Sequence, residues 1–192
     1  MATKASLRRE YLEKRKALSE AELSSYSFQL YNQFFAHADL SLVKVFHIFL
    51  PILKNAEPDT WLIIDRLRRE YPGIRLVIPK VNEEMQQLDH FFFEGLHQLK
   101  KNKWGIEEPQ QGVPAELLRI DVVIVPMLIC DHSGHRVGYG KGYYDKFLKQ
   151  VRPDCLKVGL SLFQPIDIIG DLNKQDIPLD QCITPIKIYT FN

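Results

Sequence analysis

The order of apolar and polar positions along the chain predicts two helices before any strand. Thr3 can cap a first helix that runs to about Leu18, and Ser19 followed by Glu22 forms the S-x-x-E pattern that opens a second helix. In the second helix, apolar residues recur at steps of three and four positions, which gives it one buried side; they are Leu23, Tyr26, Leu30 and Phe34. The N-terminal part is therefore expected to be a helical pair.

Short runs rich in β-branched and aromatic residues then alternate with helical patterns. The predicted strands cover residues 43–50, 74–79, 88–93, 121–126 and 156–161, and the predicted helices cover residues 58–70, 114–119 and 141–150. Because several of these strands are almost wholly apolar, both faces of their sheet should be covered. The alternation predicts an α/β fold: a single layered domain over residues 1–192, with a mainly parallel sheet, helices on both faces and the helical pair at the N-terminus.

The composition is that of an ordinary globular protein. Of the 192 residues, 45% are hydrophobic and 26% are charged, which argues against the disordered, fibrous and membrane classes. Lys and Arg (25) nearly balance Asp and Glu (24), so there is no overall positive field to hold a nucleic acid. Before the first predicted strand, no apolar run has the length of a membrane span or of a secretion signal core. We expect a cytoplasmic monomer with no nucleic-acid or membrane partner.

The cysteines predict structural thiols and no reactive centre. Cys130, Cys155 and Cys182 are widely spaced and contain no C-x-x-C pair. His132 and His135 lie close to Cys130, but neighbouring residues on a glycine turn rarely converge as tetrahedral ligands. We expect no transition-metal site in this segment.

The candidate chemistry lies in residues 134–145, GHRVGYGKGYYD, between a predicted strand and a predicted helix. Open α/β sheets bind ligands at the carboxyl ends of their strands, so a site is expected at this point. Glycines let the backbone approach a ligand and present N–H groups, and Arg136 and Lys141 add full positive charges. The segment therefore predicts an anion site, and phosphate is the expected anion.

The spacing of the glycines excludes the two commonest nucleotide motifs. G-x-G-x-G-Y-Y matches neither the G-x-x-x-x-G-K-[ST] loop of nucleoside triphosphatases nor the G-x-G-x-x-G fingerprint of dinucleotide-binding folds. Three glycines alone could form a plain connection between strand and helix. An Arg, a Lys, two Tyr and an Asp within ten residues favour a phosphate loop of another kind, because a connector needs few of them.

Residues 125–148, VPMLICDHSGHRVGYGKGYYDKFL, resemble the signature of the 5-formyltetrahydrofolate cyclo-ligase family, also called methenyltetrahydrofolate synthetases. KASLRREYLEKRKALS resembles the basic opening helix of the family, and EPDT at residues 57–60 resembles its E-x-x-T element. NKWGIEEP resembles its Trp-Gly-Ile-x-x-Pro segment, and QDIPLDQCIT resembles its Asp-x-Pro-x-Asp closing stretch. The resemblance covers nearly the whole chain in the same order.

The resemblance implies a ligase that converts 5-formyltetrahydrofolate into 5,10-methenyltetrahydrofolate, with ATP as co-substrate, Mg²⁺ as cofactor, and ADP and phosphate released. The ATP-binding residues that it implies are Lys4, Arg8, Arg136, Val137, Gly138, Tyr139, Gly140, Lys141, Gly142, Tyr143 and Tyr144. The implied folate-binding residues are Glu57, Trp104, Tyr139, Gly140, Lys141, Gly142 and Tyr143. Asp145 and Asp176 would bind Mg²⁺, and the implied catalytic residues are Lys141, Arg136 and Tyr143.

Several of these residues also have structural explanations when they are judged without the resemblance. Lys4 and Arg8 lie one helical turn apart and could form a solvated basic face. Glu57 could be placed at a helix start for its interaction with the helix dipole. Trp104 could be a packing residue, and Asp176 could serve only the hydrogen bonds of a turn.

Two other classes of function remain open from the residues alone. One is an adaptor that binds a nucleotide or nucleic acid through the basic N-terminal helix without turnover, which the near-neutral total charge disfavours. The other is a sugar-phosphate or coenzyme A enzyme on a similar sheet, which would bind phosphates without hydrolysing ATP.

Overall fold

The computed structural model describes residues 2–103 and 105–191 and is built around a mainly parallel sheet. Seven strands lie in the order β11-β10-β9-β6-β1-β2-β3, and the five inner ones are parallel. Both edge strands are antiparallel to their neighbours. In chain order the strands are β1 (Val45–His47), β2 (Arg75–Asn82), β3 (Gln87–Phe92), β6 (Val122–Pro126), β9 (Leu156–Leu160), β10 (Gln181–Ile183) and β11 (Ile188–Thr190). The predicted α/β class and the mainly parallel sheet are confirmed.

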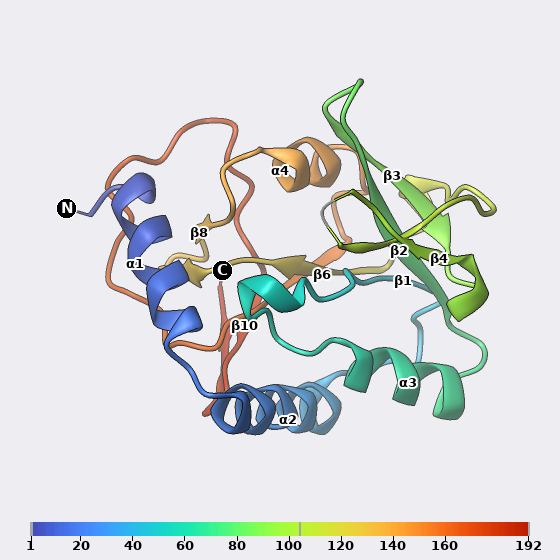
Figure 1. Ribbon diagram of the computed structural model, residues 1–192, viewed down its shortest axis with the longest axis horizontal. Coiled ribbons are helices and arrows are strands. Elements are labelled where there is room, and N and C mark those ends of the chain that lie inside the picture. Colours follow the sequence, from blue (N-terminus) through green and yellow to red (C-terminus); the bar gives the residue numbers. More distant parts are fainter. Residues whose placement is uncertain (1, 104, 192) are drawn as a thin grey trace.

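The described part of the chain forms four α-helices around the sheet: α1 (Lys4–Lys16), α2 (Glu20–His37), α3 (Trp61–Glu70) and α4 (Tyr143–Leu148). Thr3 caps α1 and Ser19 caps α2 in a capping box with Glu22, as the sequence predicts. Thr3 also forms a capping box, with Ser6, which was not predicted. Helices α2 and α3 cover one face of the sheet and α4 lies over the other (Figure 1). In residues 2–103 and 105–191 there is no helix with both the length and the apolar content that a membrane crossing needs.

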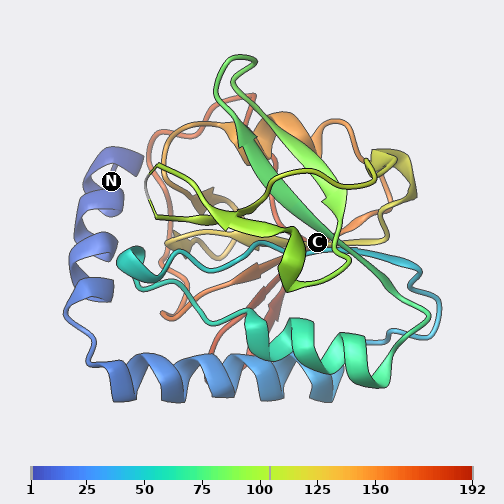
Figure 2. The same cartoon turned by 45° about the vertical axis from the view of Figure 1, so that its right-hand side comes forward.

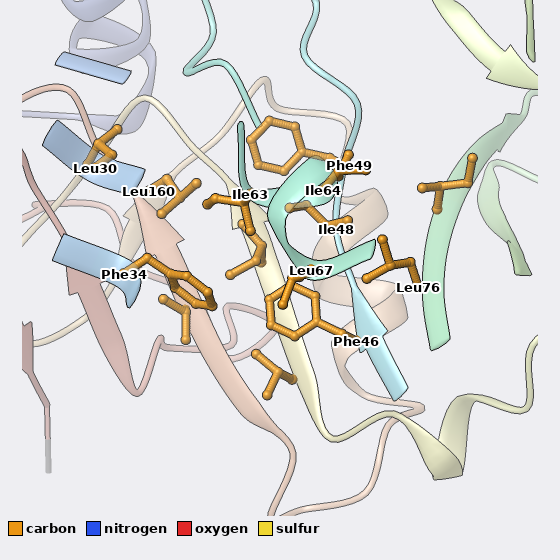
Figure 3. Packing of buried hydrophobic residues seen from close by; sticks show 14 of the residues in the cluster. Leu30, Phe34, Phe46, Ile48, Phe49, Ile63, Ile64, Leu67, Leu76 and Leu160 are labelled. Carbon is orange, nitrogen blue, oxygen red and sulfur yellow. The ribbon is translucent and has the colours of Figure 1, made fainter. Parts of the chain in front are cut away.

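The central strand β6 is buried on both faces, which explains its unbroken apolar run. Val122 and Ile124 pack into the core beneath α2 and α3. Val123 and Val125 point the other way, into the core beneath α4. Successive side chains of a strand alternate between faces, so a strand covered by helices on both sides must be apolar throughout. Figure 3 shows part of the first core, where Leu30 and Phe34 of α2 meet Ile63, Ile64 and Leu67 of α3 above the sheet.

Helix α1 lies at one end of the sheet and covers neither face (Figure 2). It packs on a two-stranded ribbon, β7 (Ile129–Cys130) with β8 (Arg136–Val137), which follows β6 directly. Leu7 and Tyr11 of the helix are buried against Leu128 and Val137. This contact brings the N-terminal helix to the loop that follows the ribbon.

Several predicted elements differ from the structure, among them the helix predicted at residues 58–70, which begins at Trp61. The helix predicted at residues 114–119 is wrong, since only Leu117–Arg119 form a short 3-10 helix; Pro114 lies in an extended bridge with Phe91. Helix α4 begins at Tyr143 because Gly140 and Gly142 have positive φ angles, which a right-handed helix excludes. The strand predicted at residues 43–50 is shorter, Val45–His47.

The remaining short strands carry too little periodicity to be predicted. The strands β10 and β11 near the C-terminus have three residues each, and so do β4 (Leu99–Lys101) and β5 (Glu107–Pro109) of a small separate sheet. Their existence depends on pairing with distant partners, which no local pattern records.

Candidate active site

A cavity of about 650 Å³ lies at the carboxyl ends of the inner strands, where an open α/β sheet is expected to bind its ligand. The loop after β8, the segment after β1, the start of α1 and the β2–β3 hairpin all contribute to its wall. Its polar and charged lining is Lys4, Arg8, Lys54, Asn55, Glu57, Glu107, Glu108, Arg136, Tyr139, Lys141, Tyr143, Tyr144, Asp145, Asn173 and Asp176. Most of the predicted site residues therefore meet in one cavity, although they come from distant parts of the chain.

The glycine loop, residues 138–142, owes its path to two left-handed positions. Gly140 has φ +85° and Gly142 has φ +68°, a region that disfavours any side chain. Arg8 of α1 donates from Nε to the carbonyl oxygen of Gly138 at 2.9 Å, which fixes the loop to the N-terminal helix. Because α4 has only six residues, side chains must supply most of the positive charge that a phosphate would need.

Four cations of the cavity fall into two groups. Lys4 forms an ion pair with Asp176, and Arg136 donates from Nη2 to Asp145 at 2.8 Å. Arg8 and Lys141 form no ion pair with a carboxylate in the part of the chain that the structure describes. The loop can therefore accept an anion at these two side chains without first breaking an ion pair.

Asp145 and Asp176 lie close to Arg136. Asp145 belongs to α4, and Asp176 to the segment between β9 and β10. Asp145 lies in the first turn of α4 and also accepts the backbone N–H of Ile177 at 3.2 Å. Although partial burial raises the pKa of Asp176, the N–H of Asn173 and the ammonium of Lys4 outweigh it and lower that pKa overall. Both carboxylates border the cavity, and Mg²⁺ prefers one or two carboxylates together with phosphate oxygens and water. The donor set thus fits such an ion once a phosphate is bound.

No protein-only metal site is present in the ranges 2–103 and 105–191, since no three His, Cys, Asp or Glu side chains gather there in a suitable arrangement. Asp131 instead orders the turn of the β7–β8 ribbon. Its carboxylate accepts the backbone N–H groups of Ser133 at 3.0 Å and His135 at 2.9 Å, and it is fully buried. Its role in the turn is structural.

Glu57 lines the cavity and is the centre of a buried cluster of polar groups. It is 4% exposed and accepts the backbone N–H of Ile52 at 2.7 Å and the hydroxyl of Tyr139. Burial raises the pKa of Glu57, while the hydrogen bonds from Tyr139 and Ile52 and the charge of Arg15 oppose that rise. Arg15 donates to the same Tyr139 hydroxyl at 3.2 Å and to the carbonyl oxygen of Met127.

The rest of the cavity wall is apolar. The β2–β3 hairpin contributes Val81 and Leu88, and the segment after β1 contributes Leu50 and Ile52. An apolar wall beside the buried Glu57 suits a flat ring with a few polar atoms. The cavity thus combines a cationic loop with an apolar wall.

A buried histidine pair lies beside the cavity. His47 at the end of β1 and His90 of β3 share a hydrogen bond of 3.1 Å between Nε2 and Nδ1. Burial lowers the pKa of both rings, that of His90 to about 4. Because these pKa values are lowered, the pair is neutral at physiological pH. Both rings also contact Phe147 of α4 and help to hold that helix in place.

The predicted site residue Val137 does not line the cavity, and Arg15, which does contact the site residue Tyr139, was not predicted. The side chain of Val137 is buried beneath α1. Trp104 lies outside the described residues. Arg15 was not singled out, because an arginine among other basic residues of a helix gives no sign that it faces inward; only its spacing from Leu7 and Tyr11 places it near the buried side.

Comparison with known proteins decides the family. The model of the 5-formyltetrahydrofolate cyclo-ligase family matches residues 1–185. The chain belongs to this family. Among curated members, a mouse 5-formyltetrahydrofolate cyclo-ligase is 31% identical over 156 residues, which cover 78% of this chain and 75% of the mouse protein. The Escherichia coli K12 cyclo-ligase is 25% identical over 187 residues, covering 92% and 97%.

Solved structures of the cyclo-ligase family share the fold. A 5,10-methenyltetrahydrofolate synthetase from Aquifex aeolicus superposes with a TM-score of 0.83 at 28% identity, covering 98% of this chain and 93% of that one. The synthetase from Mycoplasma pneumoniae gives 0.75 at 26% identity, covering 95% and 98%. As a cyclo-ligase family member the chain is an enzyme of the ligase class, and its small-molecule substrate is a folate.

Proposed function

We propose that the enzyme uses ATP and Mg²⁺ to convert 5-formyltetrahydrofolate into 5,10-methenyltetrahydrofolate, releasing ADP and phosphate. The observation that carries the proposal is the cavity itself. It joins two cations that form no ion pair with a carboxylate of the described residues, Arg8 and Lys141, to an apolar wall around the buried Glu57. A triphosphate and a planar reduced folate need these two environments next to each other.

The formyl group explains why a phosphate site must adjoin the folate site. An amide oxygen is a poor leaving group, so the formyl oxygen first attacks the γ-phosphorus of ATP, and the bond from that phosphorus to the oxygen shared with ADP breaks. N10 then bonds to the activated carbon and loses its proton, and the carbon–oxygen bond breaks to release inorganic phosphate. No covalent enzyme nucleophile is required for these steps.

The chain's own residues neutralise charge and fix geometry in this scheme. Phosphoryl transfer depends mainly on positioning and on stabilising charge at the phosphoryl oxygens. Arg8, Lys141 and Arg136 would contact these oxygens, and Tyr143 borders the same loop. Asp145 and Asp176 would hold Mg²⁺, which neutralises phosphate charge when bound. Glu57 would accept hydrogen bonds from the folate ring.

The N-terminal helix argues against the nucleic-acid adaptor. A helix that binds a polyanion must present its cations to solvent. Here Lys4 is paired with Asp176, Arg8 holds the carbonyl of Gly138, and Arg15 is 1% exposed. These three cations are engaged within the protein and are not available to a polyanion. Of the exposed cations of the helix, Lys14 is paired with Glu10, which leaves Arg9 and Lys16.

One assay tests the proposal directly. Purified protein mixed with ATP, Mg²⁺ and 5-formyltetrahydrofolate should produce the near-ultraviolet absorbance of the methenyl product. Mixtures that lack ATP or the folate should stay unchanged. If the complete mixture gives no chromophore, the proposed reaction is wrong.

A further inference from the structure

Arg15 is buried although it belongs to a basic, largely solvated part of α1. It is 1% exposed, whereas the neighbouring Lys14 and Lys16 face solvent. A guanidinium has five N–H donors, accepts no hydrogen bond and stays protonated, so burying it costs free energy unless its donors find acceptors. Two acceptors meet Arg15, the carbonyl oxygen of Met127 and the hydroxyl oxygen of Tyr139, whereas its Nε has no hydrogen-bond partner among the described residues.

This arrangement fixes the direction of a chain of hydrogen bonds. Arg15 can only donate, so the oxygen of Tyr139 must accept at 3.2 Å. The side chain of Asn55 also hydrogen-bonds to this hydroxyl and, like Arg15, opposes the rise in the pKa of Tyr139, as a donor does. The single proton of the hydroxyl is then directed to Oε1 of Glu57. The second oxygen of Glu57 accepts from the backbone N–H of Ile52. Each carboxylate oxygen keeps one free lone pair, and both act as acceptors.

We propose that Arg15 is a positioning residue for the folate substrate: acting through Tyr139, it keeps Glu57 an ionised acceptor for a ring that presents N–H donors to the cavity. The inference rests on the proposed function and deepens it, because it names the residues that recognise the folate ring, whereas the glycine loop would recognise the phosphates of ATP. Arg15 lies behind Tyr139 and does not line the cavity. A protonated Glu57 would present a donor, which would repel a ring N–H.

The groups around Glu57 show why Arg15 controls its charge. The facing groups are Arg15 from α1, Tyr139 from the glycine loop, the N–H of Ile52, and Tyr144 from α4, with Lys54 in the same cavity wall. Burial raises the pKa of Glu57, and Tyr139, Ile52 and Arg15 oppose that rise. The charge on Arg15 also opposes the rise in the pKa of Tyr139. Removing the guanidinium would therefore raise the pKa of Glu57 further and free the hydroxyl proton of Tyr139 to turn away.

The test compares Arg15→Gln with a control variant, Lys16→Gln. The control also removes one positive charge, but from the exposed neighbouring position of the helix. KM values for 5-formyltetrahydrofolate and for ATP are measured from pH 6 to pH 8.5. For Arg15→Gln we expect the folate KM to rise by about tenfold, the effect of weakening a hydrogen bond to a charged group, while the ATP KM stays nearly constant. The folate KM should rise further as the pH falls, and Lys16→Gln should behave as the wild type.

Two results would overturn the proposal. One is an equal rise in both KM values, and the other is a wild-type pH profile in a folded Arg15→Gln protein, with folding checked by circular dichroism. If Arg15→Gln does not fold, Tyr139→Phe, which breaks the same chain of hydrogen bonds, must show the folate-specific rise. If the wild type itself forms no chromophore, the proposed reaction is wrong. The role of Arg15 is then tested separately by calorimetry, in which Arg15→Gln should bind 5-formyltetrahydrofolate more weakly than the wild type and Lys16→Gln should not.

Discussion

Arg8 of the first helix lies so close to Gly140 of the glycine loop that a Cβ atom on Gly140 would come within 2.9 Å of the guanidinium carbon. Gly140 also has φ +85°, a conformation that L side chains rarely adopt. The same arginine donates to the carbonyl of Gly138. The shape of the loop and the place of the arginine are thus fixed together, although 132 positions separate Arg8 from Gly140 in the chain (140 minus 8).

Gly140→Ala is expected to weaken ATP binding and to destabilise the fold. The left-handed backbone costs about 1–2 kcal/mol for a residue with a side chain, and the methyl group would also displace Arg8. Urea unfolding should show the lost stability, and the KM for ATP should rise. Gly142→Ala is the comparison, because its φ of +68° brings the strain, but its Cβ would meet no atom within 4 Å. An equal rise in the ATP KM for both variants would show that displacement of Arg8 is unimportant.

Lys141→Ala is expected to reduce turnover at least about 100-fold, the usual cost of removing a group that stabilises charge in a transition state. Lys141 is exposed and has no ion pair within residues 2–103 and 105–191, so the melting temperature should change little. Lys146→Ala, which removes an exposed lysine from α4, is the control and should keep full turnover. A large loss of stability together with normal turnover would assign Lys141 a structural role.

Asp145→Asn should reduce both stability and the response to Mg²⁺. Arg136 is only 6% exposed at its side chain, and Asp145 is its ion-pair partner, so the change leaves a buried guanidinium poorly compensated. We expect a loss of about 1–3 kcal/mol in the free energy of unfolding. The Mg²⁺ concentration for half-maximal activity should also rise. Asp154→Asn, at an exposed carboxylate, should alter neither quantity; an unchanged Mg²⁺ response in Asp145→Asn would remove that residue from the metal site.

The buried histidine pair should make the protein less stable in mild acid. Burial lowers the pKa of His90 from 6.5 to about 4, so between these values the unfolded chain binds a proton that the folded protein excludes. Stability is therefore complete above pH 6.5 and falls as the pH drops towards 4, by up to about 3 kcal/mol for His90 alone. His90→Leu should flatten the dependence of melting temperature on pH in this range.

The exposed His97 provides the control for this experiment. His97→Gln should keep the pH dependence of the wild type. If His90→Leu shows the same slope as the wild type between pH 7 and pH 4, other groups are responsible for the acid sensitivity.

The sequence predicted the class of fold because its local signals agree with the tertiary structure. Thr3 and Ser19 cap their helices as predicted, and the apolar run of β6 lies between two helical layers. Short elements were missed or misjudged. The segment from Pro114 was predicted as a helix, but pairing with Phe91 holds it extended, and a pairing partner 23 positions away (114 minus 91) is not visible in a local pattern.

For the site, the sequence by itself determined which chemistry is available: a glycine loop with Arg136 and Lys141, whose residue types predict an anion site. Glycine, arginine and lysine are informative one at a time, because conformational freedom and charge belong to the residue. Only the tertiary structure decided how the cations are used. It paired Lys4 with Asp176, left Arg8 and Lys141 without a carboxylate partner in the described ranges, and buried Arg15 behind Tyr139 and Glu57. The reason is that burial and ion pairing depend on distances between residues far apart in the chain, and only the folded chain fixes those distances.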